Sequence, residues 1–99
     1  MRNPNPLEKV IEEKVCDHAK AQGWLVYKFT SPNRMAVPDR LLIRNGQVVF
    51  IEFKRKGEKP TPPQEREHTR LRGAGMTVWV IDSVEAGKEM VDSYAATNP

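Results

Sequence analysis

Hydrophobic residues along the 99-residue chain recur at helical spacing in some segments and cluster in short strand-like runs in others. Between about residues 7 and 22 they recur every three or four positions, as on one face of a helix, at Leu7, Val10, Ile11, Val15 and Ala19. Gly23 ends this run, as glycine commonly does after a helix. Two later segments also predict helices: a polar one that starts near Pro63 and ends at Gly73 or Gly75, and a last one for which Ser83 is the N-cap.

Four segments rich in β-branched and aromatic residues predict strands over residues 24–30, 40–44, 47–54 and 76–82. The second and third flank Asn45-Gly46, the two-residue sequence that most favours a tight hairpin. The predicted order is therefore α-β-β-β-α-β-α, an α/β fold of the α+β kind with a mixed sheet flanked by helices. We expect one domain over residues 7–95, after an irregular lead-in at 1–6 and before a tail at 96–99.

Composition narrows the class of protein only slightly. The 16 Lys and Arg residues exceed the 13 Asp and Glu residues, and the net charge of +3 is compatible with a polyanionic partner without identifying one. The single cysteine excludes an intrachain disulfide, and with only two histidines it cannot form a structural zinc site. No apolar run approaches the roughly 20 residues of a membrane span. We therefore expect an intracellular protein without a membrane partner or a small-molecule cofactor.

The strand predicted at 47–54 carries charges inside an apolar sequence. Side chains along a strand alternate between its faces, so Phe50, Glu52 and Lys54 share one face, opposite Val49, Ile51 and Phe53. A second Glu-x-Lys, at residues 12–14, lies on the first predicted helix, where positions two apart point about 200° apart. Only the strand copy places a carboxylate and an ammonium on one surface. Burial of such charges is costly unless they pair or bind a metal.

Asp39 adds a second carboxylate to this surface. Pro38 favours extended backbone at the start of the hairpin's first strand, and, depending on the hairpin register, Asp39 lies near Glu52. Mg²⁺ or Mn²⁺ prefers such ligands and suits phosphate chemistry. The pattern predicts phosphodiester hydrolysis, in which Asp39 and Glu52 hold the metal and Lys54 steadies the attacking hydroxide or the developing charge. The alternatives are a turn role for Asp39 and a solvated cross-strand ion pair for Glu52 and Lys54.

Three segments resemble the PD-(D/E)xK nuclease superfamily and, within it, the small stand-alone form of the virus-type replication-repair nuclease (VRR-NUC) domain of phages and bacteria. They are YKFTSPNRMAVPDRLLI, GQVVFIEFKRKGEKPTPPQ and LRGAGMTVWVID. The resemblance implies a restriction-endonuclease-like core, with Asp39 and Glu52 as metal ligands and Lys54 as the catalytic lysine. One departure is Met35-Ala36, which stands where the family frequently has a glycine.

The same resemblance implies two more active-site residues. The first helix of such domains contributes an acid near the metal, for which Glu12 is best placed, with Glu8 one turn earlier as the alternative. Gln64 falls where the family has a glutamine that faces the active site. A solvated helix acid and an ordinary polar residue at a helix start are the structural alternatives. His68 is interpreted as a packing or surface residue.

Basic and polar residues near the predicted metal site are candidates for contacts with DNA. They are Lys28, Ser31, Arg34, Arg55, Lys56 and Lys59. The last three follow the Glu-x-Lys directly, and phosphate contacts there would make binding strongly dependent on salt. The alternative is a set of solvated loop charges.

Stand-alone members of the family resemble endonucleases that act on four-way DNA junctions as homodimers. The implied function is therefore a Mg²⁺- or Mn²⁺-dependent endonuclease for branched or other double-stranded DNA, in the cytoplasm of a bacterial or phage-infected cell. Met90, Val91 and Tyr94 of the last helix are one candidate dimer contact. Two other functions stay open: a module that binds nucleic acid without cleaving it, and an accessory subunit of a replication or repair complex.

Overall fold

The computed structural model describes the backbone of residues 6–97 and the side chains of residues 7–94. Its elements are α1 (Pro6–Ala21), β1 (Leu25–Lys28), β2 (Arg40–Arg44), β3 (Gln47–Phe53), α2 (Pro62–Gly73), β4 (Thr77–Ile81) and α3 (Val84–Thr97). This order and the mixed sheet confirm the predicted fold class. Residues 1–5 of the predicted lead-in and 98–99 of the predicted tail lie outside the described residues, and α3 continues through 96 and 97.

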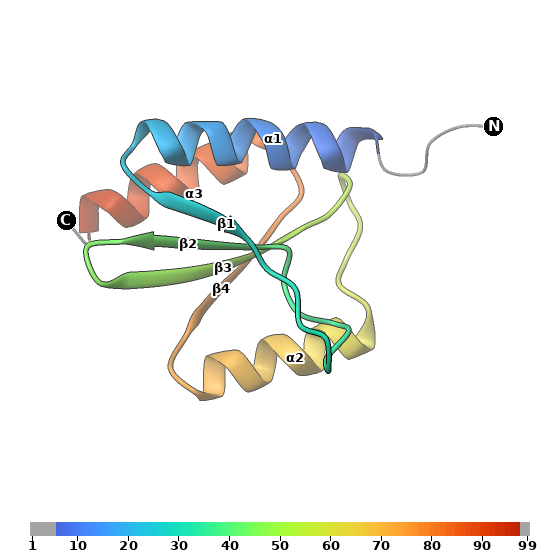
Figure 1. Cartoon of the computed structure of the whole chain (residues 1–99). Helices are drawn as coiled ribbons and strands as arrows, with labels where there is room; N and C mark the ends of the chain where they lie inside the picture. The colour runs from blue at the N-terminus through green and yellow to red at the C-terminus, as the bar shows by residue number, and fades with distance from the viewer. Residues whose placement is uncertain (1–5, 98–99) are drawn as a thin grey trace.

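The four strands form one sheet in the order β1-β2-β3-β4. The first three pair antiparallel, and β4 runs parallel to β3. A parallel neighbour requires a crossover, which α2 provides. Figure 1 shows that α1 and α3 cover one face of the sheet and α2 covers the other. The Arg72 side chain ties the end of this crossover to the sheet, because its Nη2 donates to the Val78 carbonyl at 2.7 Å.

The turn between β2 and β3 sets the register of the hairpin that places Asp39 and Glu52. Asn45 has φ 50° and Gly46 has φ 76°, so both turn residues adopt the left-handed conformation of a tight hairpin. Arg40 then pairs with Ile51, and the hydrogen bonds of Asp39 to Ile51 and Phe53, the two neighbours of Glu52, set Asp39 beside Glu52. At the far side of the sheet, β1 is shorter than predicted, because Thr30 would have to pair with Pro38, which has no N–H to donate.

The main core lies between the sheet and the pair α1 and α3. Val49, Ile51 and Phe53 of β3 are fully buried there, which confirms the predicted alternation. Their neighbours in this cluster are apolar as well, among them Val15 of α1 and Val91 of α3. On the opposite face of β3, Phe50 packs against Phe29, and Glu52 contacts Gln64 and His68 of α2. Among residues 6–97, no helix has both the length and the apolar character needed to cross a bilayer.

Candidate active site

The carboxylate of Asp39 is fixed against the neighbouring strand. Its backbone N–H donates to the Ile51 carbonyl at 2.9 Å, and its Oδ2 accepts from the backbone N–H of Phe53 at 2.8 Å. These two bonds straddle Glu52, the residue that the hairpin register sets beside Asp39. The structure therefore brings together the two acids that the sequence predicts as metal ligands.

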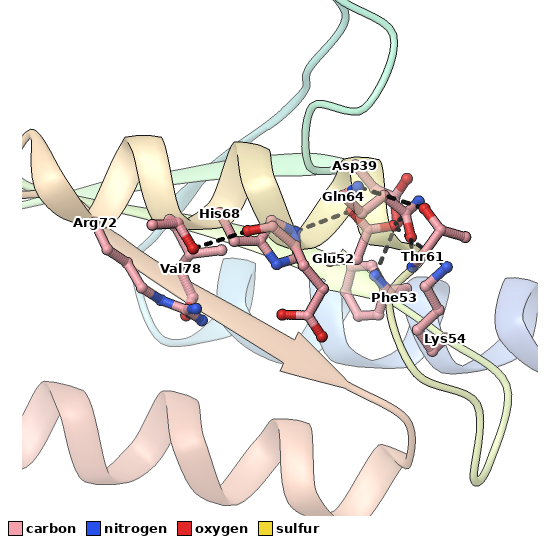
Figure 2. Close-up of polar contacts among 11 residues, drawn as sticks. Asp39, Glu52, Phe53, Lys54, Thr61, Gln64, His68, Arg72 and Val78 are labelled. Atoms are coloured by element: carbon pink, nitrogen blue, oxygen red, sulfur yellow. Dashed lines mark hydrogen bonds and ion pairs between the residues drawn. The ribbon is translucent and has the colours of Figure 1, made fainter.

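Glu52 is a buried acid held by side chains of α2. It is only 3% exposed. Gln64 Nε2 donates to its Oε2 at 3.1 Å, and His68 Nε2 lies 3.4 Å from its Oε1. The Lys54 ammonium, itself mostly buried, is 4.0 Å from Oε2. Figure 2 shows these groups gathered at one end of α2, between the helix and the sheet.

Gln64 is oriented by the way α2 begins. Thr61 is the N-cap of the helix, and its hydroxyl accepts from the Gln64 backbone N–H at 3.4 Å. The Gln64 Oε1 accepts in return from the Thr61 backbone N–H at 2.9 Å, which completes a capping box. Because the amide oxygen is used in this way, the amide NH₂ group faces Glu52. A helix cap thus positions a hydrogen-bond donor in the site.

The electrostatics of the pair follow from burial and from mutual repulsion. Burial, and next the charge of Asp39, raise the pKa of Glu52 to about 8, while Lys54 opposes the rise. Burial also raises the pKa of Asp39, and the hydrogen bond from the Phe53 N–H opposes this. Two carboxylates are therefore held together where water solvates them poorly.

This donor set fits a divalent cation. Two carboxylate ligands on adjacent strands match the hard oxygen donors that Mg²⁺ and Mn²⁺ prefer, and a cation would relieve their repulsion. Within residues 7–94, no three Asp, Glu, His or Cys side chains converge as a complete metal cage. Mg²⁺ usually retains several waters and takes one or two protein carboxylates, so a two-acid site suffices for it.

The two acids of α1 lie in different surroundings. Glu12 accepts from Arg40 Nε at 2.6 Å, yet its charge still contributes to the raised pKa of Asp39. Burial, followed by Asp39, raises the pKa of Glu8, and Glu8 in turn raises that of Glu52. The charge of Glu12 therefore acts on Asp39, and the charge of Glu8 acts on Glu52. Glu12 as the helix acid, with Glu8 as the alternative, stays a prediction.

The interpretation of His68 as a packing or surface residue is incomplete. The ring is buried at 1% exposure, but its Nε2 points to the Glu52 carboxylate. Burial lowers the pKa of this histidine, followed by the charge of Arg72. A signal was present in the sequence, because His68 lies four positions after Gln64 and so on the same face of the helix.

The predicted DNA-contact residues near the site differ in their exposure to solvent. Lys56 and Lys59 are exposed on the loop after β3, whereas Arg55 is half-buried. This loop is anchored where Gly57 N–H donates to Asp82 Oδ2 at 3.0 Å. On the β1 side, exposed Lys28 lowers the pKa of Asp39 through its charge.

The other two predicted DNA-contact residues lie in the loop between β1 and β2. The half-buried Ser31 accepts through its carbonyl from the Arg34 N–H at 3.4 Å. The Arg34 side chain pairs with Glu67 of α2. The loop charges are therefore partly engaged with the protein itself.

The candidate dimer contact on α3 is partly wrong. Val91 is fully buried in the main core and cannot meet a second chain without unfolding of the helix. Tyr94 packs its ring against Trp24 and Trp79 and donates from its hydroxyl to Gln47 Oε1 at 2.9 Å. The apolar spacing therefore identified a core position at Val91, whereas Met90 and Tyr94 are half-buried.

Comparison with known proteins agrees with this geometry. No family model matches the sequence. The protein named "Putative nuclease p44", from Acyrthosiphon pisum secondary endosymbiont phage 1, is 48% identical over 77 residues, which cover 77% of this chain and 83% of that protein. A solved structure described as "VRR_NUC domain" superposes with a TM-score of 0.77 at 31% identity, covering 93% of this chain and 97% of the other. Near-complete coverage at this identity shows the family, and the chain belongs to the VRR-NUC family.

Proposed function

We propose that this protein is a Mg²⁺- or Mn²⁺-dependent endonuclease that hydrolyses phosphodiester bonds of branched DNA. The observation that carries the proposal is the hairpin register, which sets Asp39 beside Glu52 with the Lys54 ammonium 4.0 Å from the Glu52 carboxylate. The similarity to a phage protein named as a nuclease supports the same chemistry. A bacterial or phage-infected cytoplasm is the setting in which such a protein would act.

Asp39 and Glu52 would hold the metal ion. When bound, the ion supplies positive charge that polarises the phosphate and makes water a better nucleophile at neutral pH. The protein contributes the placement of both carboxylates: the Phe53 N–H holds Asp39, and Gln64 with His68 holds Glu52. Preorganised ligands of this kind need no rearrangement before the reaction.

Lys54 acts on the charge that develops during hydrolysis. The water oxygen bonds to phosphorus, the bond from phosphorus to one deoxyribose oxygen breaks, and in sum one proton passes from the water to the leaving oxygen. Negative charge grows on the phosphate oxygens as this happens. An ammonium that is only 13% exposed stabilises such charge more strongly than one in bulk water.

We further propose that the protein cuts branched DNA as a homodimer. Paired cuts in a four-way junction require two active sites, and two-fold symmetry is the commonest way to supply them. The described chain offers one Asp39–Glu52 pair. Light scattering on the eluted protein tests this part separately from catalysis: a dimer supports it, and a monomer that still makes paired cuts contradicts it.

The experiment that tests the function is a cleavage assay with matched substrates and variants. A four-way junction, a flap and a linear duplex of the same sequence are incubated with the protein in Mg²⁺, Mn²⁺ or EDTA. We expect cuts in the junction with either metal, none in EDTA, and none with Asp39→Asn or Glu52→Gln. Glu89→Gln, an exposed change on α3, is the matched control and should cut like wild type. Binding of the junction without any cut would favour a binding module instead.

A further inference from the structure

A hollow lies between the loop that joins β1 to β2 and the helix α2, away from the Asp39–Glu52 pair. Its volume is about 480 Å³, and its lining includes Arg34 of the loop and Arg66, Glu67 and Arg70 of α2. Figure 1 shows the loop running beside α2. Three guanidiniums face a single carboxylate here, so the hollow is strongly positive.

Glu67 organises the arginines around it. The residue is buried at 9% exposure. Its Oε1 accepts from Arg34 Nε at 3.1 Å and lies 3.5 Å from Arg70 Nε. Both guanidiniums therefore present their Nε edge to the same oxygen. A buried carboxylate that receives two arginines fixes the direction of each planar group.

The outer edges of these guanidiniums stay available. The ion pairs of Arg34 and Arg70 with Glu67 are made through Nε, and no side chain of residues 7–94 forms a hydrogen bond or ion pair with Arg66. The side chains of Arg34 and Arg70 are 48% and 63% exposed, so their Nη donors reach solvent. Planar guanidinium donors of fixed direction match the oxygens of a phosphate diester.

A purely structural role explains only part of this arrangement. Glu67 with Arg34 alone would fasten the loop to α2, and one arginine would satisfy a carboxylate. Arg66 lines the hollow without holding anything in the protein, and Arg70 adds a second cation to an oxygen already bonded. The excess of positive charge has no partner within the described residues, and an anionic ligand would supply one.

The two segments that line the hollow also lead to the proposed active site. The loop that carries Arg34 ends at Asp39, and the helix that carries Arg66 and Arg70 has Gln64, which donates to Glu52, in its first turn. Arg70 lies six residues beyond Gln64, which is about 9 Å along a helix axis.

We propose that Arg34, Arg66 and Arg70 bind neighbouring backbone phosphates of the DNA substrate, next to the bond that is cut; the proposal rests on the nuclease function proposed above. The site holds the strand that leads into the Asp39–Glu52 pair. Its contacts are to phosphate oxygens, so it contributes affinity and register without reading sequence.

The test removes the two cations of α2 that do not fasten the loop. Arg66→Gln/Arg70→Gln is compared with wild type and with Lys14→Gln/Lys88→Gln, which removes two exposed charges from the other face of the molecule. Binding of fluorescent junction DNA is measured by anisotropy in EDTA over a range of salt concentrations. We expect about ten-fold weaker binding and a log–log salt slope shallower by about two for the first variant only. At subsaturating DNA with Mg²⁺, its cleavage should fall in proportion to the lost affinity.

Each outcome separates this site from the catalytic proposal. Unchanged affinity and salt slope in Arg66→Gln/Arg70→Gln would overturn the phosphate site, even where wild type cuts DNA. Loss of affinity and slope in a protein that never cuts would support the phosphate site and refute the nuclease. The single change Arg66→Gln guards against misfolding, because Arg66 has no protein partner among residues 7–94; it should lower the slope by about one.

Discussion

The two faces of the sheet are built on opposite principles. The face under α1 and α3 is apolar throughout its centre, with Val49, Ile51 and Phe53 fully buried. On the side of α2, by contrast, three polar or charged side chains are buried: Glu52 of β3, and Glu67 and His68 of the helix. Apolar burial stabilises a fold without a ligand, whereas buried acids lower stability unless something compensates them. Stability and chemistry are therefore divided between neighbouring residues of one strand.

The largest expected effect is on the apolar face. Phe53→Ala should reduce the free energy of unfolding by about 3–5 kcal/mol, since it removes a fully buried ring and leaves a cavity. Small domains have about 5–15 kcal/mol in total, so much of the protein's stability would be lost. Urea unfolding followed by circular dichroism measures the change. The division between faces would be wrong if Glu52→Gln, on the adjacent position, cost as much.

The next largest effect is expected on the cleavage rate when the Lys54 ammonium is removed. Lys54→Met should slow junction cleavage about 10²–10³-fold, or about 2.7–4 kcal/mol, because the developing phosphate charge loses its nearest cation. Mn²⁺ binding should persist, since both carboxylates remain. Single-turnover cleavage measures the rate, with Lys88→Met on α3 as the matched control. A normal cleavage rate in Lys54→Met would remove Lys54 from the mechanism.

A smaller effect concerns pH. The pKa of Glu52 is about 8 in the folded protein, above its ordinary value of 4.5, so the folded state binds more protons between these pH values. The stabilising contribution is fully present below pH 4.5 and is lost as the pH rises through about 8. Metal-free wild type should therefore lose about 1.4 kcal/mol per pH unit relative to Glu52→Gln between pH 6 and 7. Parallel stability curves for the two proteins in EDTA would contradict this.

The smallest expected effect links the helix cap to the site. Thr61→Ala should cost about 1 kcal/mol of stability, because the Gln64 N–H loses its capping hydroxyl. Cleavage should fall modestly as well, since Gln64 also donates to Glu52. Thr61→Ser retains the hydroxyl and should restore both quantities. Loss of stability with fully normal cleavage would show that the cap does not position Gln64.

The hairpin allowed half of the active site to be predicted from sequence. Asn45-Gly46 fixes a two-residue turn, the turn fixes the register, and the two-residue period of a strand fixes the face on which Glu52 and Lys54 lie. Asp39 follows from the same register. These relations are local, so they do not depend on how the rest of the chain packs.

The contacts that helix residues make in the candidate site could not be predicted from the sequence in the same way. The hydrogen bond between Gln64 and Glu52 and the contact of His68 depend on how α2 is rotated against the sheet. The choice between Glu8 and Glu12 as the helix acid depends on the position of α1 along the sheet. The pairing of Arg34 with Glu67 depends on the path of an irregular loop. Each of these is set by tertiary packing, which sequence periodicity does not report.

The most direct test of the central claim is a titration of Mn²⁺ into metal-free wild type, Asp39→Asn and Glu52→Gln, with isothermal calorimetry as the readout. If the two acids share one cation, wild type should bind Mn²⁺ measurably. Either variant should bind Mn²⁺ with an affinity lower by about 100-fold or more. Equal binding of Mn²⁺ by all three proteins would contradict the account.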